Sequence, residues 1–168
     1  MDSNLSLDIG FKGQLSLNAQ AVPLQEGYLK LGGITDPDGS DLPFGVVVSA
    51  DPLTPDMFEA GAASGNVVRG VSVFDDAIAQ NAPAHPGKYL AGLPCAAICH
   101  GFFYLGSWTK TATAAIDPVI GCKVIYNTTS GVIEFLASSG SAPDGWAELS
   151  NASVRNVDAD NGALVYLE

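Results

Sequence analysis

Two cysteines and a histidine, Cys95, Cys99 and His100, lie within six residues and form the first grouping that could do chemistry. A c-type haem attachment site has two residues between its cysteines, whereas three separate Cys95 from Cys99. A structural zinc site needs four ligands, and only Cys122 and His85 remain among the cysteines and histidines to complete one. On a β-strand, Cys95 and Cys99 would share one face and His100 would take the other. We therefore predict reduced, metal-free cysteines that serve as small core residues.

Two acidic turns, at residues 36–41 and 158–162, resemble the start of a calcium-binding loop. An EF-hand loop has glycine at its sixth position and glutamate at its twelfth, and the first turn has Asp41 and Val47 there. The second turn reaches residue 168 before a twelfth position. We interpret both as ordinary acidic turns, the alternative being a weak calcium site built across subunits.

The adjacent carboxylates Asp75 and Asp76 could serve acid–base catalysis. They precede a candidate helical turn, where the helix dipole favours aspartate, so we interpret them as structural. The chain has no Gly-x-Ser-x-Gly, His-Glu-x-x-His or phosphate-loop motif, and no charged residue lies between Lys88 and Lys110. These observations predict a protein that is not an enzyme and that uses no cofactor.

The elements that would position these residues are short strands. Alternating or β-branched apolar runs are separated by Gly, Pro, Asp and Ser turns, a pattern typical of sandwiches and barrels. The clearest hairpin joins residues 122–127 to 132–137 through a turn at 128–131, and a strand at 66–74 has a glycine kink at Gly70. The uncharged stretch before Lys110 predicts two buried strands, 90–98 and 101–108, joined at a glycine bend. The expected fold class is all-β, a small barrel or sandwich of short antiparallel strands with an extended N-terminal arm.

The N-terminal segment alternates apolar and polar residues in two runs, with apolar residues at Leu5, Leu7 and Ile9 and then at Leu15 and Leu17. This pattern predicts an arm at residues 1–20, followed by a single β domain at residues 21–168. Such an arm would bury its apolar face by pairing with the sheet edge of a partner. An ordinary edge strand of the same domain is the alternative.

Composition excludes several classes of partner. Eighteen acidic residues against seven basic ones give a net charge of −11, which phosphate backbones and anionic membrane surfaces repel. The N-terminus has no basic and apolar leader pattern, and three is an odd number of cysteines, so we expect free thiols in an unexported protein. Glycines and Pro94 interrupt the longest uncharged stretch, so it does not read as a membrane span.

From residue 44 to the C-terminal end, the order of features resembles the capsid decoration, or structural cement, proteins of tailed bacteriophages. The likeness consists of a Gly-Val-x-Val strand, then a Tyr-x-x-Gly-x-Pro segment, then a glycine–aromatic strand. The matching segments are residues 44–48, 65–76, 89–96, 101–105, 121–126 and 165–167.

This resemblance implies a non-enzymatic protein on the outer surface of an icosahedral head, where it stabilises contacts between major capsid subunits. Its partners would be the major capsid protein and copies of itself, for example as a homotrimer, with no nucleic acid or membrane. It would be assembled in the host cytoplasm and reside in the virion. The alternatives are another virion component, such as a tail or fibre domain, and a β-barrel enzyme or ligand-binding domain with a pocket lined by Phe102, Phe103, Tyr104 and Trp108.

Overall fold

In the part of the chain that the structure describes, short apolar runs between turn residues fold into thirteen β-strands, which confirms the predicted all-β class. The computed structural model describes residues 20–22, 28–75, 78, 87–106, 110–158 and 162–168. In these segments, no helix has the length and apolarity needed to cross a bilayer. In chain order, the strands are β1 (Gln20–Val22), β2 (Tyr28–Thr35), β3 (Leu42–Pro43), β4 (Val47–Ala50), β5 (Met57–Ala60), β6 (Val67–Ser72), β7 (Lys88–Tyr89), β8 (Pro94–Leu105), β9 (Lys123–Asn127), β10 (Ile133–Leu136), β11 (Trp146–Glu148), β12 (Ala152–Val157) and β13 (Ala163–Leu167).

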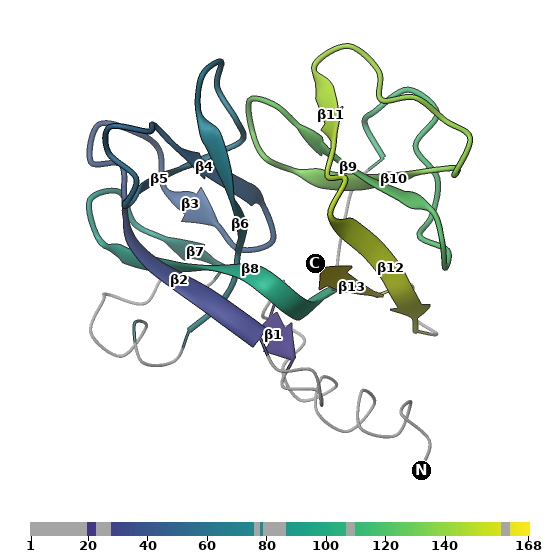
Figure 1. Cartoon of the computed structure of the whole chain (residues 1–168), viewed down its shortest axis with the longest axis horizontal. Helices are drawn as coiled ribbons and strands as arrows, with labels where there is room; N and C mark the ends of the chain where they lie inside the picture. Colours follow the sequence, from purple (N-terminus) through teal and green to yellow (C-terminus); the bar gives the residue numbers. More distant parts are fainter. Residues whose placement is uncertain (1–19, 23–27, 76–77, 79–86, 107–109, 159–161) are drawn as a thin grey trace.

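Five strands close into a barrel in the order β8, β2, β5, β4, β6 and back to β8 (Figure 1). Four of the five pairings are antiparallel, as expected, but β2 and β5 pair in parallel. The parallel pair arises because the chain crosses over through β3 and β4 before β5 returns beside β2.

The predicted glycine kink at Gly70 lies where this barrel closes. Gly70 has a φ of 146°, and a Cβ added there would lie 2.1 Å from the carbonyl oxygen of Ile98 on β8. The next residue, Val71, pairs with Ile98 in the closing ladder. Only glycine allows β6 to approach β8 this closely.

The twelve-residue strand β8 corrects one prediction. We expected two strands that meet at a glycine bend, but Pro94–Leu105 is continuous. Gly101 lies inside it with a φ of 104°, and the ladder to β2 has a β-bulge at Cys99. The chain stays extended because β8 has partners along its whole length: β2 and β6 on its barrel half, then β1 and β13 on its second half.

The predicted hairpin is confirmed as β9 and β10, and β11 completes a second antiparallel sheet on the right of Figure 1. Its turn docks against the barrel: Val47 N donates to Gly131 O (2.8 Å), and Ala62 N donates to Thr128 O (2.8 Å). A Cβ added at Gly131 would lie 2.3 Å from Val47 O, so glycine is needed at this contact as well.

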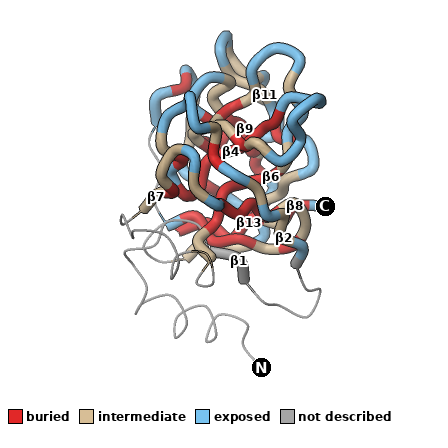
Figure 2. Tube along the Cα trace, turned by 90° about the vertical axis from the view of Figure 1, so that its left-hand side faces the viewer, coloured by how far each residue is buried: buried red, intermediate tan, exposed pale blue. Residues whose placement is uncertain are grey.

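One apolar core runs through both parts of the molecule. Phe58 comes from the barrel, Phe103 from the second half of β8 and Phe135 from the second sheet, and all three are fully buried. The two-stranded sheet of β3 and β7 adds Tyr89, whose ring packs edge-on against Phe44 and whose hydroxyl donates to Val73 O (2.6 Å). Figure 2 shows buried residues through the centre of the chain and exposed residues on the peripheral loops.

Candidate interaction surface

The cysteine–histidine group does not converge on one point. Cys95 is fully buried in the core, whereas Cys99 is the extra residue of the bulge and His100 is partly exposed. The bulge interrupts the strict alternation that we expected along this strand. Burial raises the pKa of Cys95 to about 11 and also raises the pKa of Cys122. Within the described segments, no three His, Cys, Asp or Glu side chains are grouped to hold a metal ion.

The acidic turns use their carboxylates to stabilise their own loops. Asp36 Oδ1 accepts a hydrogen bond from the N–H of Asp38 (3.0 Å). Asp41 accepts from Lys88 Nζ (2.6 Å) and from the N–H of Ala91 (3.1 Å), which ties this loop to β7 and to the segment after it. These contacts support the interpretation as acidic turns.

The second acidic turn is closed by Asp158, whose carboxylate accepts from the Tyr104 hydroxyl (2.6 Å) and from the N–H of Gly162 (2.6 Å). Of the adjacent carboxylates Asp75 and Asp76, the first forms an ion pair with Lys30, and the second lies outside the described residues. Asp75, the described member of the possible catalytic pair, is thus engaged in a structural contact.

The aromatic residues of β8 do not line one pocket. Phe103 is fully buried in the core, and Phe102 and Tyr104 point to the opposite face of the strand because side chains alternate. Trp108 lies outside the described residues.

The predicted partner-binding residues Leu5, Leu7, Ile9, Leu15 and Leu17 all lie outside the described residues. The first described strand, β1, pairs antiparallel with β8 from Gln20 opposite Tyr104 to Val22 opposite Phe102. Residue 20 therefore lies beside the second half of β8.

A buried carboxylate that we did not single out in the sequence positions a surface loop. Glu134 on β10 is fully buried, and it accepts hydrogen bonds from Thr111 N (2.8 Å), Thr111 Oγ1 (2.6 Å) and Ala112 N (2.9 Å). Ile116 N also donates to Phe135 O (2.9 Å). The sequence signal was a charged residue in the middle of an apolar strand, because such a residue is buried only when it is well paired.

The loop that Glu134 holds presents apolar side chains to solvent. Val119 is 52% exposed and Ile120 is 69% exposed. They lie in a tight turn in which Cys122 N donates to Val119 O (3.1 Å), and Gly121 adopts a φ of 82°. Two β-branched side chains are thus exposed on a hydrogen-bonded turn.

A second apolar area surrounds the loop at residues 51–56. Leu53 is 91% exposed, and Ile34 at the end of β2 is 47% exposed. Asp51 holds this loop by accepting from Leu53 N (2.7 Å), and the N–H of Ile34 donates to Asp56 O (2.8 Å). This loop also presents its apolar residues in a fixed backbone conformation. Val119, Ile120, Leu53 and Ile34 are named the apolar loop residues below.

Comparison with family models gives no match, and comparison with curated proteins gives none either. Among solved structures, the fold is similar to a chain of the structure titled "The capsid of Myoviridae Phage XM1". The TM-score is 0.60 at 15% sequence identity, and the alignment covers 89% of this chain and 90% of that chain. The two chains therefore share this all-β fold over nearly their full lengths.

Proposed function

We propose that this protein is a structural component of a phage head, a decoration protein that binds the outer surface of the capsid and stabilises contacts between major capsid subunits. The observation that carries the proposal is the full-length likeness to a chain of a phage capsid structure. Coverage of 89% and 90% means that the likeness is between two chains of similar size, not between a small domain and part of a large protein.

The surface supports a binding role. Of the apolar loop residues, Val119 and Ile120 lie on the loop that Glu134 holds, and Leu53 lies on the loop that Asp51 holds. Ile34 lies beside that second loop, near the end of β2. A loop whose backbone is already held loses less conformational entropy when a partner covers it, which favours binding. The engaged carboxylates Asp41, Asp75 and Asp158 and the raised thiol pKa values support a non-enzymatic role.

In this proposal the partners are the major capsid protein and other copies of the chain. The protein acts in the virion after assembly in the host cytoplasm. A net charge of −11 favours protein partners over the packaged nucleic acid.

The test is co-sedimentation of purified protein with isolated heads that lack it. We expect saturable binding with a fixed number of copies per head. Substitution of both Val119 and Ile120 by Ser should weaken binding, because it removes exposed apolar area without touching the core. Thr113→Ala, at an exposed position of the same loop, is the matched control and should bind normally. Absence of saturable binding by the folded wild-type protein would overturn the proposal.

A further inference from the structure

One face of the sheet formed by β2, β8, β13 and β12 carries a connected group of aromatic and cationic side chains. Tyr166 on β13 lies at its centre. Its ring centroid is 4.7 Å from that of Phe102 and 5.7 Å from that of His100, both on β8. The guanidinium carbon of Arg155 on β12 lies 5.2 Å from the same ring centroid.

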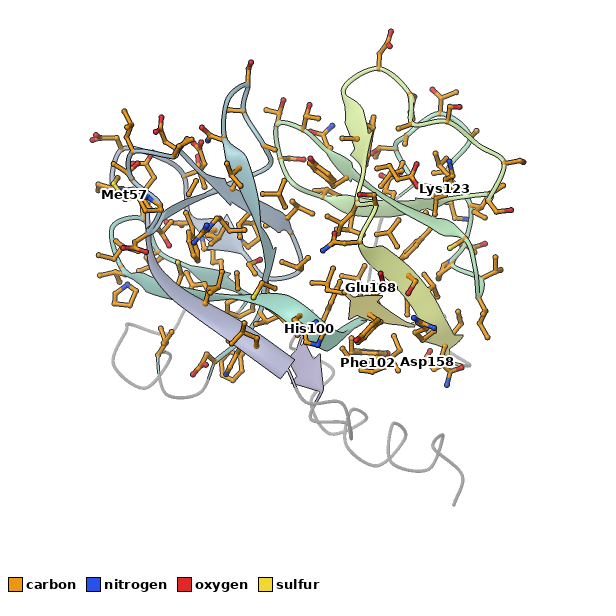
Figure 3. The ribbon with its side chains drawn as sticks, in the orientation of Figure 1. Met57, His100, Phe102, Lys123, Asp158 and Glu168 are labelled. Carbon is orange, nitrogen blue, oxygen red and sulfur yellow. The ribbon has the colours of Figure 1, made fainter. Side chains whose placement is uncertain are left out.

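Strand register explains why these side chains meet. Phe102 and Tyr166 are directly opposite each other across β8 and β13, and His100 is opposite Leu29 on β2. Leu29 is 55% exposed. Arg155 is the extra residue of a β-bulge between β12 and β13, which turns its side chain over Tyr166. Figure 3 shows the His100 and Phe102 side chains where β8 passes beside β13. Leu29, His100, Phe102, Arg155 and Tyr166 are named the aromatic face below.

Arg155 is an unusual cation in this chain. Each of the four described lysines forms an ion pair with a carboxylate: Lys30–Asp75, Lys88–Asp41, Lys110–Asp117 and Lys123–Glu148. Neither arginine of the described residues has a carboxylate partner, and Arg69 is partly buried. Arg155 is exposed, and stacking on Tyr166 leaves the N–H donors at the edge of its guanidinium plane available for a carboxylate.

The same face also carries an exposed carboxylate. Glu168 comes directly after β13, two positions after Tyr166. Its N–H donates to Asn151 O (2.9 Å), and this hydrogen bond extends the β12–β13 ladder by one residue pair. Because side chains alternate along extended chain, Glu168 and Tyr166 point to the same side. An exposed cation and an exposed anion thus lie apart on one surface, with aromatic rings beside them.

We propose that two copies of this chain pair through the aromatic face about a two-fold axis, with Arg155 of each copy binding Glu168 of the other. A two-fold interface needs a self-complementary surface. If a residue of the first copy contacts a different residue of the second copy, the same pair also forms with the two copies exchanged. Arg155 and Glu168 supply that relation by their charges, and Phe102, Tyr166 and Leu29 supply apolar area. Arg and Tyr are also residue types enriched at the energetic centres of interfaces. The pairing gives a geometry to the self-association that is part of the proposed function, and it does not depend on head binding.

Sedimentation velocity of purified protein over a concentration series up to about 100 µM tests the pairing, since such interfaces fall in the micromolar range or tighter. We expect the wild type to shift from monomer to dimer. Arg155→Glu and Glu168→Arg should each raise the dissociation constant by roughly 30-fold or more. An equimolar mixture of these two variants should recover a heterodimer, because both interface pairs are then opposite in charge. Lys123→Glu makes the same charge change on β9, distant in sequence from the aromatic face, and should dimerise like the wild type.

A monomeric wild type over this range would overturn the proposal, as would an Arg155→Glu variant that dimerises normally. Loss of dimer on deletion of residues 2–18, with Arg155→Glu unaffected, would instead assign self-association to the N-terminal segment. Failure of head binding with a normal dimer would reject the proposed function alone. Circular dichroism of each variant confirms that it is folded.

Discussion

The Glu134 carboxylate, fully buried on β10, accepts two hydrogen bonds from Thr111, one from its N–H (2.8 Å) and one from its hydroxyl (2.6 Å). Thr111 is distant in sequence from Glu134 and begins the loop that presents Val119 and Ile120. A buried anion thus fixes a surface loop to the core.

We expect Glu134→Gln to lower the free energy of unfolding by about 2–3 kcal/mol, because charge-assisted hydrogen bonds are lost and one buried N–H faces an amide NH₂. Urea denaturation measures the change. Glu148→Gln removes the carboxylate of a surface ion pair with Lys123 and should cost no more than about 1 kcal/mol. Equal effects of the two substitutions would contradict the role of Glu134.

The close approach of Gly70 to Ile98 predicts that a larger residue at position 70 destabilises the fold. Gly70→Ala places a methyl group 2.1 Å from the Ile98 carbonyl oxygen, so we expect about 3 kcal/mol of destabilisation from steric conflict and backbone strain. Gly65 also has a positive φ, of 92°, but open space surrounds its Cβ position. Gly65→Ala should therefore cost only about 1 kcal/mol. Thermal unfolding of both variants separates the destabilisation caused by the steric conflict from that caused by backbone strain. Similar losses of stability in the two variants would argue against tight barrel closure at Gly70.

Thiol chemistry should separate the cysteines. Burial raises the pKa of Cys95 to about 11 and raises that of Cys122, so both stay protonated and shielded at neutral pH. We expect iodoacetamide at pH 7.5 to modify the partly exposed Cys99 first, and the other two only after unfolding, as read by peptide mass spectrometry. Rapid native labelling of Cys95 would contradict its burial.

The raised pKa of Cys95 also gives a pH dependence of stability. Burial raises the pKa of this thiol from 9.0, its ordinary value, to about 11 in the folded chain. The protonated form is therefore favoured by folding, and this contribution is complete below pH 9 and is lost as the pH rises to 11. Cys95→Ala should reduce the alkaline loss of stability between these pH values, measured by denaturation at each pH. An unchanged pH profile in this variant would contradict the assignment.

The N-terminal segment carries a prediction from the alternation at Leu5, Leu7, Ile9, Leu15 and Leu17. If it is an assembly arm, deletion of residues 2–18 should leave the melting temperature nearly unchanged and abolish head binding. If the deletion unfolds the domain, the segment is an ordinary edge strand and the arm interpretation is wrong.

Local patterns predicted the elements that local chemistry determines. The β9–β10 hairpin followed from two apolar runs around a glycine-containing turn, and the kink at Gly70 followed from a glycine within a strand. The continuity of β8 could not be predicted in this way, because it depends on partners from residues 20–35 and 163–167. The parallel pairing of β2 with β5 has the same long-range origin.

For the surface residues too, the sequence indicated single residues but not the distant residues that they contact. Glu134 left a visible signal, a charge within an apolar run, but its partners at Thr111 and Ala112 became apparent only in the fold. The position of Arg155 was harder to predict from the sequence. A β-bulge turns its side chain over Tyr166, and alternation of apolar and polar residues does not reveal a bulge. The chemistry-bearing residues that sequence did reveal, such as Cys95 and Asp41, serve the core and the loops.

Cryo-electron microscopy of heads that lack this protein, with and without the purified protein added, tests binding to the outer surface of the capsid directly. We predict added density on the outer surface of the shell, at joints between major capsid subunits, with a shape that fits the barrel and the second sheet. No added density, or density confined to the tail or to the interior of the head, would contradict the proposed decoration role.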